Sequence, residues 1–256
     1  METSMVAIKT RIWMEKPVAD NEFAPEQSFL YGQNFYSDLA EKQSYVALTF
    51  LHLNGQLPTS HQEKWLGFLL SLAANPGIRD ESTLVAMNTA IGAPPSVNSV
   101  LAGLMARSGL SRGAQWVEKV MENLSLAESQ SASLASFQPY NGLGKHYDDS
   151  DWRAKSAMPW LKANSCWGKH CELLENNATQ SAEILLEGLI AAGLLDLGFS
   201  PAAGAVLFLL AAGPALTAYA LEQQAAGYKN FPNYFAPGHY SHSGAKPKSE
   251  KETETD

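Results

Sequence analysis

Apolar residues dominate one continuous stretch of the chain, from Ile184 to Leu221. The stretch holds only two charges, Glu187 and Asp196, and one strong break at residues 198–201. Apolar side chains before the break favour membrane insertion by roughly 4 kcal/mol, whereas the two acids oppose it by roughly 5–6 kcal/mol. The half after the break is uncharged, but it is mostly Ala and Gly and contains Pro214. The pattern therefore predicts two helices packed in the core of a soluble protein rather than a membrane hairpin.

Shorter apolar and amphipathic segments elsewhere along the chain predict further helices. They cover Ser44–Asn54, Ser60–Ala74, Ser82–Ile91, Val97–Arg107, Gly113–Leu126 and Trp152–Ala163. Gly55 is a typical helix stop, and Pro159 is expected to bend or restart its helix. Ser60 and Glu63 have the spacing of a capping box. Strand signals are confined to the first fifteen residues and residues 127–151 are expected to form loops, so the pattern predicts an all-α fold class.

Charge and cysteine content narrow the class of protein further. The formal net charge of -8 argues against nonspecific nucleic-acid binding, which depends on Lys and Arg at phosphates. No apolar run of signal-peptide length opens the chain, so a cytoplasmic protein without a membrane partner is expected. Cys166 and Cys171 lack the spacing and the additional ligands of a zinc site, so no metal is expected. The polar segment 241–256 is predicted to be a disordered tail.

Several short segments occur in the order found in one enzyme superfamily. The segments are residues 38–59 (DLAEKQSYVALTFLHLNGQLPT), 142–144 (GLG), 151–154 (DWRA), 188–199 (GLIAAGLLDLGF), 207–222 (LFLLAAGPALTAYALE) and 231–238 (FPNYFAPG). The first ends in a Gly-x-Leu-Pro turn, and residues 188–199 resemble the helix that follows the family's catalytic aspartate. Across residues 28–238 the chain thus resembles the citrate synthase and citryl-CoA lyase superfamily, as a divergent member.

This resemblance implies an architecture and an assembly. A citrate synthase-like fold has a large helical domain, here residues 1–111 plus 191–240, and a smaller helical domain, here residues 112–190. The smaller domain is expected to close over a cleft. The family works as a dimer, so the resemblance also implies a homodimer, or a heterodimer with a citrate synthase-like paralogue.

The resemblance also implies candidate site residues. In the family a carboxylate removes a proton from the α-carbon of an acyl-CoA thioester, and histidines stabilise the enolate and polarise the acceptor carbonyl. Glu187 aligns with the catalytic aspartate, and either Lys145 or His146 occupies the position of the histidine in Gly-x-Gly-His. A coenzyme A thioester is the implied substrate, held by residues Gly142, Gly144, Lys145 and Arg153.

Other positions depart from the family pattern. Ser111 replaces the first histidine of His-Gly-Gly-Ala, and it is a candidate either for a catalytic nucleophile or for the cap of the helix after Gly113. Ala212 replaces a substrate-binding arginine, Tyr219 replaces a nearby histidine, and Phe231 replaces the arginine before a proline.

Two interpretations of function follow from these departures. The first is a catalytically degenerate homologue that serves as a structural or regulatory subunit, beside an active paralogue. The second is an active acyl-CoA-dependent acyltransferase or carbon–carbon lyase with Glu187 as the base and a substrate that is not a tricarboxylate. The loss of so many family residues favours the first interpretation.

Overall fold

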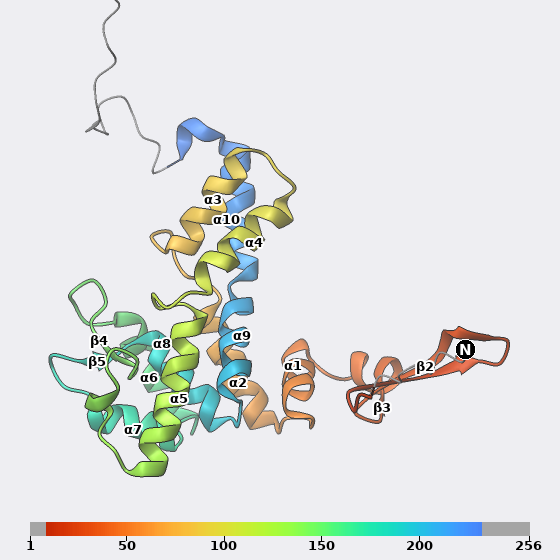
Figure 1. Ribbon diagram of the computed structural model, residues 1–256, viewed down its shortest axis with the longest axis horizontal. Helices are drawn as coiled ribbons and strands as arrows, with labels where there is room; N and C mark the ends of the chain where they lie inside the picture. Colours follow the sequence, from red (N-terminus) through yellow and green to blue (C-terminus); the bar gives the residue numbers. More distant parts are fainter. Residues whose placement is uncertain (1–8, 232–256) are drawn as a thin grey trace, which may run out of the picture.

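Helices make up most of the chain (Figure 1). The computed structural model describes residues 9–231, which contain ten α-helices and two small antiparallel sheets. The helices are α1 Tyr45–Asn54, α2 Ser60–Ala73, α3 Glu81–Ile91, α4 Ser96–Arg107, α5 Ala114–Gln130, α6 Trp152–Ala163, α7 Lys169–Asn177, α8 Leu186–Asp196, α9 Pro201–Ala211 and α10 Gly213–Ala226. The strands are β1 Trp13–Val18, β2 Asn21–Leu30, β3 Gln33–Asn34, β4 Leu143–Gly144 and β5 Glu183–Ile184. The predicted helical class is confirmed.

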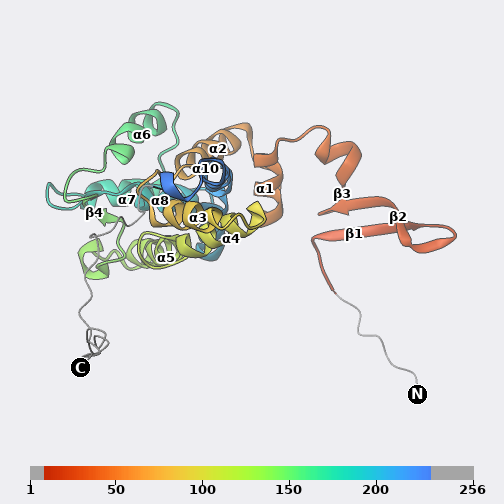
Figure 2. The same cartoon turned by 90° about the horizontal axis from the view of Figure 1, so that it is seen from above.

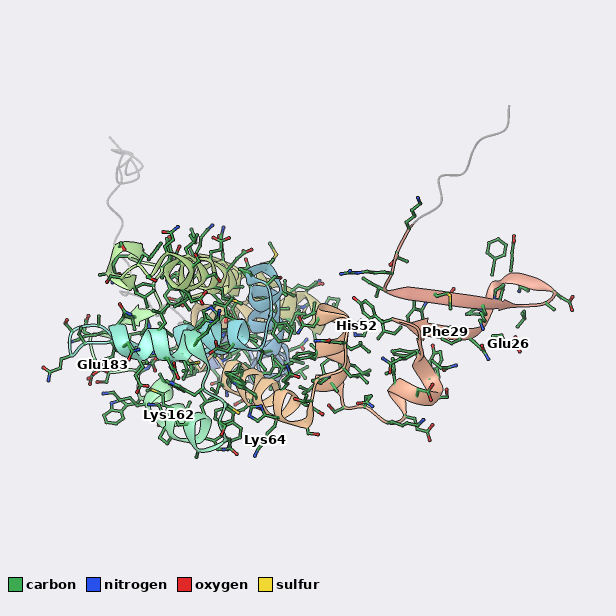
Figure 3. All side chains as sticks on the ribbon, turned by 90° about the horizontal axis from the view of Figure 1, so that it is seen from below. Glu26, Phe29, His52, Lys64, Lys162 and Glu183 are labelled. Atoms are coloured by element: carbon green, nitrogen blue, oxygen red, sulfur yellow. The ribbon has the colours of Figure 1, made fainter. Side chains whose placement is uncertain are left out.

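A three-stranded sheet at the N-terminal end extends well beyond the predicted strand region. β1 and β2 form a hairpin that projects away from the helical body (Figures 2 and 3). Pro17 and Pro25 lie opposite each other where the pairing register shifts, so the sequence lacks the alternation typical of a strand. Leu30 of β2 packs with Leu39 and Leu51 in a small core of its own, which ties this arm to α1.

Helix ends follow the expected capping rules, with one shift in position. Gly55 ends α1 in the left-handed conformation, with a φ of 76°. The capping box of α2 is formed by Thr59 and Gln62, one residue before the predicted pair. The predicted box was wrong because Glu63 accepts a hydrogen bond from the cap of α1 instead. α6 continues through Pro159 without the predicted restart, with the proline on its exposed side.

The long apolar stretch forms three helices rather than the predicted two. α8 occupies its first half, and the second half is divided at Ala212 into α9 and α10 because Pro214 has no N–H to continue the first helix. Residues 186–194 of α8 are all buried, so this helix lies in the core, as predicted. Within the described residues, the segment Pro201–Ala226 is long and apolar enough to cross a membrane, and 39% of its most apolar window is buried.

The sequence pattern did not predict α7, which takes its cap from a distant residue. Gly168 precedes the helix and has no side chain to cap it. Asp196, at the end of α8, accepts hydrogen bonds from the backbone N–H of His170 at 2.9 Å and of Cys171 at 3.2 Å. It also accepts one from the His170 ring at 2.8 Å. Asp196, one of the two charges in the apolar stretch, is thus a helix cap, whereas Glu187 is not.

Two clusters of buried apolar side chains hold the helical body together. The larger one joins side chains of α2, α5, α6, α7, α8 and α9. The smaller contains Ala86, Ala212 and Leu216, where α10 packs beside α3 (Figure 1). The division into domains at residues 111–112 and 190–191 stays a prediction.

Two glycines bring the loop before β4 against the first turn of α8. A Cβ at Gly188 would lie 2.2 Å from the carbonyl oxygen of Gly142 and 2.7 Å from its Cα. That same carbonyl accepts a hydrogen bond from the N–H of Leu185 at 3.1 Å. This close approach sets the position of the turn in which Glu187 lies.

The variant Gly188→Ala is therefore expected to lower the free energy of unfolding by about 1–3 kcal/mol, because backbone lies on the other side of the contact. The higher helix propensity of Ala offsets only part of this loss. Gly213→Ala is the matched control, since a Cβ there meets no atom within 4 Å. Urea unfolding followed by circular dichroism measures both, and equal stabilities of the two variants would contradict the close contact.

Candidate active site

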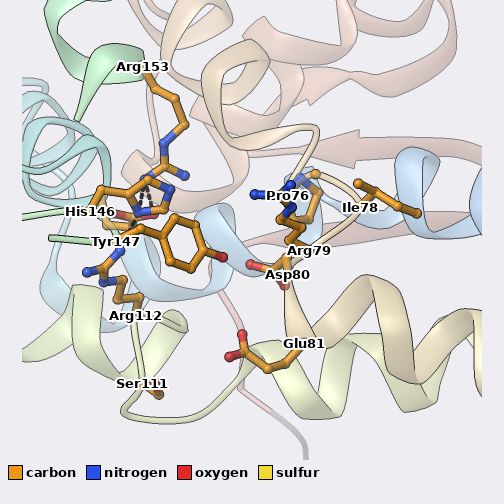
Figure 4. A pocket seen from close by; sticks show the side chains of 12 residues that line it. Pro76, Ile78, Arg79, Asp80, Glu81, Ser111, Arg112, His146, Tyr147 and Arg153 are labelled. Atoms are coloured by element: carbon orange, nitrogen blue, oxygen red, sulfur yellow. Dashed lines mark hydrogen bonds and ion pairs between the residues drawn. The ribbon is translucent and has the colours of Figure 1, made fainter. Parts of the chain in front are cut away.

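A cleft of about 630 Å³ opens where several loops meet the start of α8. It is lined by Pro76, Gly77, Ile78, Arg79, Asp80, Glu81, Ser111, Arg112, His146, Tyr147, Arg153 and Glu187. Figure 4 shows the α2–α3 loop on one side of the cleft and His146 with two arginines on the other. The cleft is strongly polar, since three arginines and three acids share its walls.

The cleft brings together four of the residues predicted from the sequence. Glu187, His146, Ser111 and Arg153 all line it. The side chain of Lys145 is exposed and does not line the cleft. Of the two candidates for the family's histidine position, His146 is thus the one that reaches this site.

The two predicted coenzyme A-binding glycines do not line the cleft. Gly142 is buried against Gly188 with a φ of 81°, and Gly144 pairs with Glu183 between β4 and β5. Both shape the segment that leads to His146. Their contact with coenzyme A stays a prediction.

A buried carboxylate organises the wall of the cleft. Asp151 is 1% exposed and accepts hydrogen bonds from the N–H of Arg153 at 3.1 Å, in α6, and of Leu186 at 2.9 Å, in α8. Two nitrogens of the Arg153 guanidinium also donate to its two oxygens, at 2.9 Å and 2.8 Å. The Asp151 carboxylate therefore caps the starts of α6 and α8 and also orients the Arg153 guanidinium.

Arg153 in turn holds the predicted base. Its Nη2 lies 3.0 Å from Oε1 of Glu187, a side chain that is 8% exposed. The other oxygen, Oε2, is buried without a hydrogen-bond partner among the described residues. Leaving a buried acceptor unpaired costs about 1–3 kcal/mol, so such a group calls for an explanation.

Hydrogen bonds and charges set the ionisation of the Asp151–Arg153 pair. Burial alone would raise the pKa of Asp151, but hydrogen bonds from Arg153 and from the N–H of Leu186 hold it below its usual value. Burial alone would lower the pKa of Arg153, but Asp151 and Glu187 raise it above its usual value. The pair is therefore ionised throughout the neutral pH range.

His146 lies against two guanidinium groups. Arg112 makes a short hydrogen bond to its Nδ1, and Nη2 of Arg153 lies 3.4 Å from the same atom. Burial lowers the pKa of His146, and the charges of Arg153 and Arg112 lower it further, while Asp151 partly opposes them. The imidazole is therefore neutral near pH 7.

Sequence reasoning missed three charged residues of this region: Asp151, Arg112 and Arg107. Asp151 opens the Asp-Trp-Arg-Ala segment, and an aspartate before a helix is a signal for a cap. Arg107 of α4 is 7% exposed, and its guanidinium lies 4.2 Å from the ring centroid of Phe208 and 3.5 Å from Asp80. No linear pattern identifies Arg107, because its partners come from other elements of the chain.

The residues predicted to replace the family's catalytic groups lie in different settings. Ser111 is exposed at the cleft, and the predicted capping role is wrong because Gly113 occupies the N-cap of α5. Ala212 is fully buried in the small core beside α3. The hydroxyl of Tyr219 donates to Oδ1 of Asn75 at 3.3 Å.

The remaining predictions concern cysteines, metal and the C-terminal region. Cys166 and Cys171 are both buried free thiols, and burial raises the pKa of Cys171. Within residues 9–231, no group of three or more His, Cys, Asp and Glu side chains is placed to hold a metal ion. Phe231 is buried, whereas the rest of the segment 231–238 and the predicted tail 241–256 lie outside the described residues.

Comparison with solved structures identifies the fold. The structure of citryl-CoA lyase from Hydrogenobacter thermophilus matches with a TM-score of 0.79 and 23% sequence identity, covering 95% of this chain and 97% of that chain. The chain therefore has the citrate synthase-like helical fold of citryl-CoA lyase, and the resemblance predicted from sequence is confirmed at the level of the fold.

Two ATP citrate lyases share the same fold over part of their length. The enzyme from Methanothrix soehngenii, in complex with citrate and coenzyme A, matches with a TM-score of 0.73 at 12% identity, covering 96% of this chain and 42% of that chain. A mutant of the Methanosaeta concilii enzyme, in complex with (3S)-citryl-CoA, matches with a TM-score of 0.73 at 13% identity and the same coverage. No family sequence model and no curated protein sequence matches the chain.

Proposed function

We propose that the chain is an acyl-CoA-dependent enzyme that makes or breaks a carbon–carbon bond next to a thioester, with Glu187 as the base. The observation that carries this proposal is the position of Glu187, a buried carboxylate that lines the same cleft as neutral His146. The geometry thus favours the second of the two interpretations drawn from the sequence.

The cleft residues divide the reaction between them. Glu187 removes a proton from the α-carbon of the thioester, and the electron pair moves onto the thioester oxygen. Neutral His146 donates a hydrogen bond to that oxygen. The enolate carbon then attacks the acceptor carbonyl, and the alkoxide formed takes a proton from solvent. Cleavage is the reverse: the hydroxyl gives its proton to solvent, the carbon–carbon bond breaks, and the enolate takes a proton from Glu187.

Two structural neighbours support a coenzyme A thioester as the ligand class. The Methanothrix soehngenii enzyme holds citrate and coenzyme A, and the Methanosaeta concilii mutant holds (3S)-citryl-CoA. In this chain the position of the family's substrate arginine is the buried Ala212, so the proposed substrate is not a tricarboxylate.

Hydrogen exchange at the α-carbon tests this proposal. The purified protein is incubated in deuterated water with acetyl-CoA or propionyl-CoA, and loss of the α-proton signal is followed by NMR. Exchange faster than in the protein-free control supports the enzyme. The absence of exchange, together with no coenzyme A binding by calorimetry, overturns it.

A structural or regulatory subunit is the second candidate function. It is favoured by the exposed Ser111 and the buried Ala212, which leave two of the family's catalytic positions without a histidine or an arginine. A protein that neither exchanges protons nor binds coenzyme A, but forms a stable complex with a citrate synthase-like paralogue, would fit this role. A homodimer that ignores the paralogue would count against it.

A dimer is proposed for either function, in the cytoplasm and without a nucleic-acid or membrane partner. Val97, Leu101 and Met105 are exposed at four-residue spacing on α4, and Leu210 of α9 is exposed beside an apolar groove. Light scattering after gel filtration is expected to give about twice the chain mass of 27.7 kDa. A mass equal to one chain would contradict a homodimer.

A further inference from the structure

The His146 ring is approached at one nitrogen by two groups that can only donate. Nη1 of Arg112 makes a short hydrogen bond to Nδ1, and Nη2 of Arg153 lies 3.4 Å from it. A guanidinium has no acceptor and keeps its charge in proteins. Both hydrogens of Arg153 Nη2 are used by Asp151 and Glu187, so Nδ1 must present its lone pair to Nη1 of Arg112. A neutral imidazole carries a single N–H, so that N–H is on Nε2.

The Arg112 guanidinium is itself held in place from a second side. Its Nη2 donates to the backbone carbonyl of Lys145 at 2.6 Å, so the same group spans the ring and the backbone of the residue before it. The backbone of Arg112 has a φ of 57°, in the left-handed region, which aims the side chain from the α4–α5 loop toward His146. A non-glycine residue in this conformation is uncommon and is a reason to look for function.

The loop that carries His146 is fixed as well. The N–H of His146 donates to the carbonyl of Asp149 at 2.9 Å, and the N–H of Asp149 donates back at 3.2 Å. The ring of Tyr147 packs 4.4 Å from the imidazole, centroid to centroid. Nε2 of His146 has no hydrogen-bond partner among the described residues, although the residue lines the cleft.

We propose that Arg112 is a positioning residue that holds His146 as the neutral Nε2–H tautomer, so that His146 offers a hydrogen-bond donor, and no lone pair, to an oxygen atom in the cleft. This assignment rests on the proposed function only for the identity of that oxygen, which is the thioester or enolate oxygen. Arg112 stands where the family pattern has a glycine, so this device belongs to this chain.

The assignment separates the roles of the two site residues. A histidine whose only ring lone pair is engaged by a guanidinium group cannot remove a proton from a carbon acid. Glu187 is left as the base, and His146 acts as the donor that stabilises the negative charge formed.

The charged groups around the ring also set its pH dependence. Arg112 comes from the α4–α5 loop, Arg153 and Asp151 from α6 and its cap, and Glu187 from α8. The two arginines and burial outweigh the two acids, so the ring stays neutral below the usual histidine pKa. Removing the Arg112 charge is therefore expected to raise the pKa of His146 toward its ordinary value.

Two-bond proton–nitrogen NMR correlations of the full chain, with labelled histidines, test the proposal. His146 is assigned by its loss in His146→Gln. In the wild type Nε2 is expected to have the shift of a protonated nitrogen and Nδ1 that of an unprotonated one. In Arg112→Ala, His146 is expected to lose this single-tautomer signature and to titrate at higher pH. In Arg112→Lys, which keeps a donor at this position, part of the signature should remain.

The control is Arg79→Ala, which removes another cleft arginine and should leave the His146 signals unchanged. A wild-type spectrum of the Nδ1–H tautomer overturns the proposal, and so does an unchanged spectrum in folded Arg112→Ala. If Arg112→Ala does not fold, the wild-type spectrum and the Lys variant decide. The measurement needs no ligand. A protein that shows the expected tautomer but no exchange at the thioester α-carbon would therefore contradict the proposed function and leave this assignment intact.

Discussion

Replacing Glu187 with Gln is expected to slow deuterium exchange into acetyl-CoA or propionyl-CoA by at least about 100-fold, the usual range for loss of a general base. The amide has nearly the size of the carboxylate, and its oxygen can still accept from Arg153, which lies 3.0 Å from Oε1 in the wild type. It cannot accept a proton from carbon. The initial exchange rate, followed by NMR at saturating thioester, measures the effect.

Two further variants show whether the loss belongs to this carboxylate. Glu81→Gln removes an exposed carboxylate of the same cleft and is expected to exchange near the wild-type rate. Glu187→Asp keeps the charge but shortens the side chain by one methylene, and an intermediate rate is expected. Undiminished exchange in folded Glu187→Gln would rule out Glu187 as the base.

The variant Asp151→Ala is expected to lower the free energy of unfolding by about 2–5 kcal/mol, because hydrogen bonds to a charged group contribute about 1.5–3 kcal/mol and a helix cap about 0.5–2 kcal/mol. It takes away both hydrogen bonds to the Arg153 guanidinium and the caps on the N–H groups of Arg153 and Leu186. Arg153 then loses its orientation toward Glu187, so exchange should fall as well. Urea unfolding and the exchange assay measure the two effects separately.

Two matched variants isolate the causes of that loss. Asp148→Asn changes an exposed aspartate of the same loop to a residue that tolerates its positive φ of 63°, and it should be neutral. Asp151→Asn keeps an acceptor but removes the charge. A loss in Asp148→Asn as large as in Asp151→Ala would refute the special role of Asp151.

The ion pair of Asp151 with Arg153 is expected to make stability depend on pH. The pKa of Asp151 is lowered in the folded protein, so the unfolded chain binds a proton first as the pH falls. The stabilisation is complete above the unfolded pKa near 4 and is lost as the pH falls through the lower folded pKa. Unfolding curves between neutral and acidic pH should therefore show a steeper acid loss in the wild type than in Asp151→Asn. Equal slopes would show that Asp151 does not contribute.

Elements with local signals were predictable, and those with distant partners were not. α1 lies within one residue of its predicted bounds, because its cap and its glycine stop lie next to it in the chain. α7 was missed because its cap, Asp196, is supplied from the end of α8. The hairpin was missed because Pro17 and Pro25 interrupt the alternation that marks a strand.

The candidate site divides in the same way. Glu187 and His146 were named from short motifs that keep their order along the chain. Arg112 was not, because its role depends on a backbone conformation and on a ring 34 residues away. The same holds for Arg107, whose partners are the N-cap residue of α3, Asp80, and Phe208 of α9.

The helical class of this protein and the place of Glu187 within an apolar stretch follow from the amino-acid order, because hydrophobic periodicity and capping act over a few residues. The state of that acid depends on the folded chain. One oxygen of Glu187 pairs with Arg153, and the other is buried without a partner among the described residues, where the starts of α6 and α8 meet at Asp151. Burial, charge and the choice of tautomer at His146 are set by groups that come together through packing, which no local pattern records.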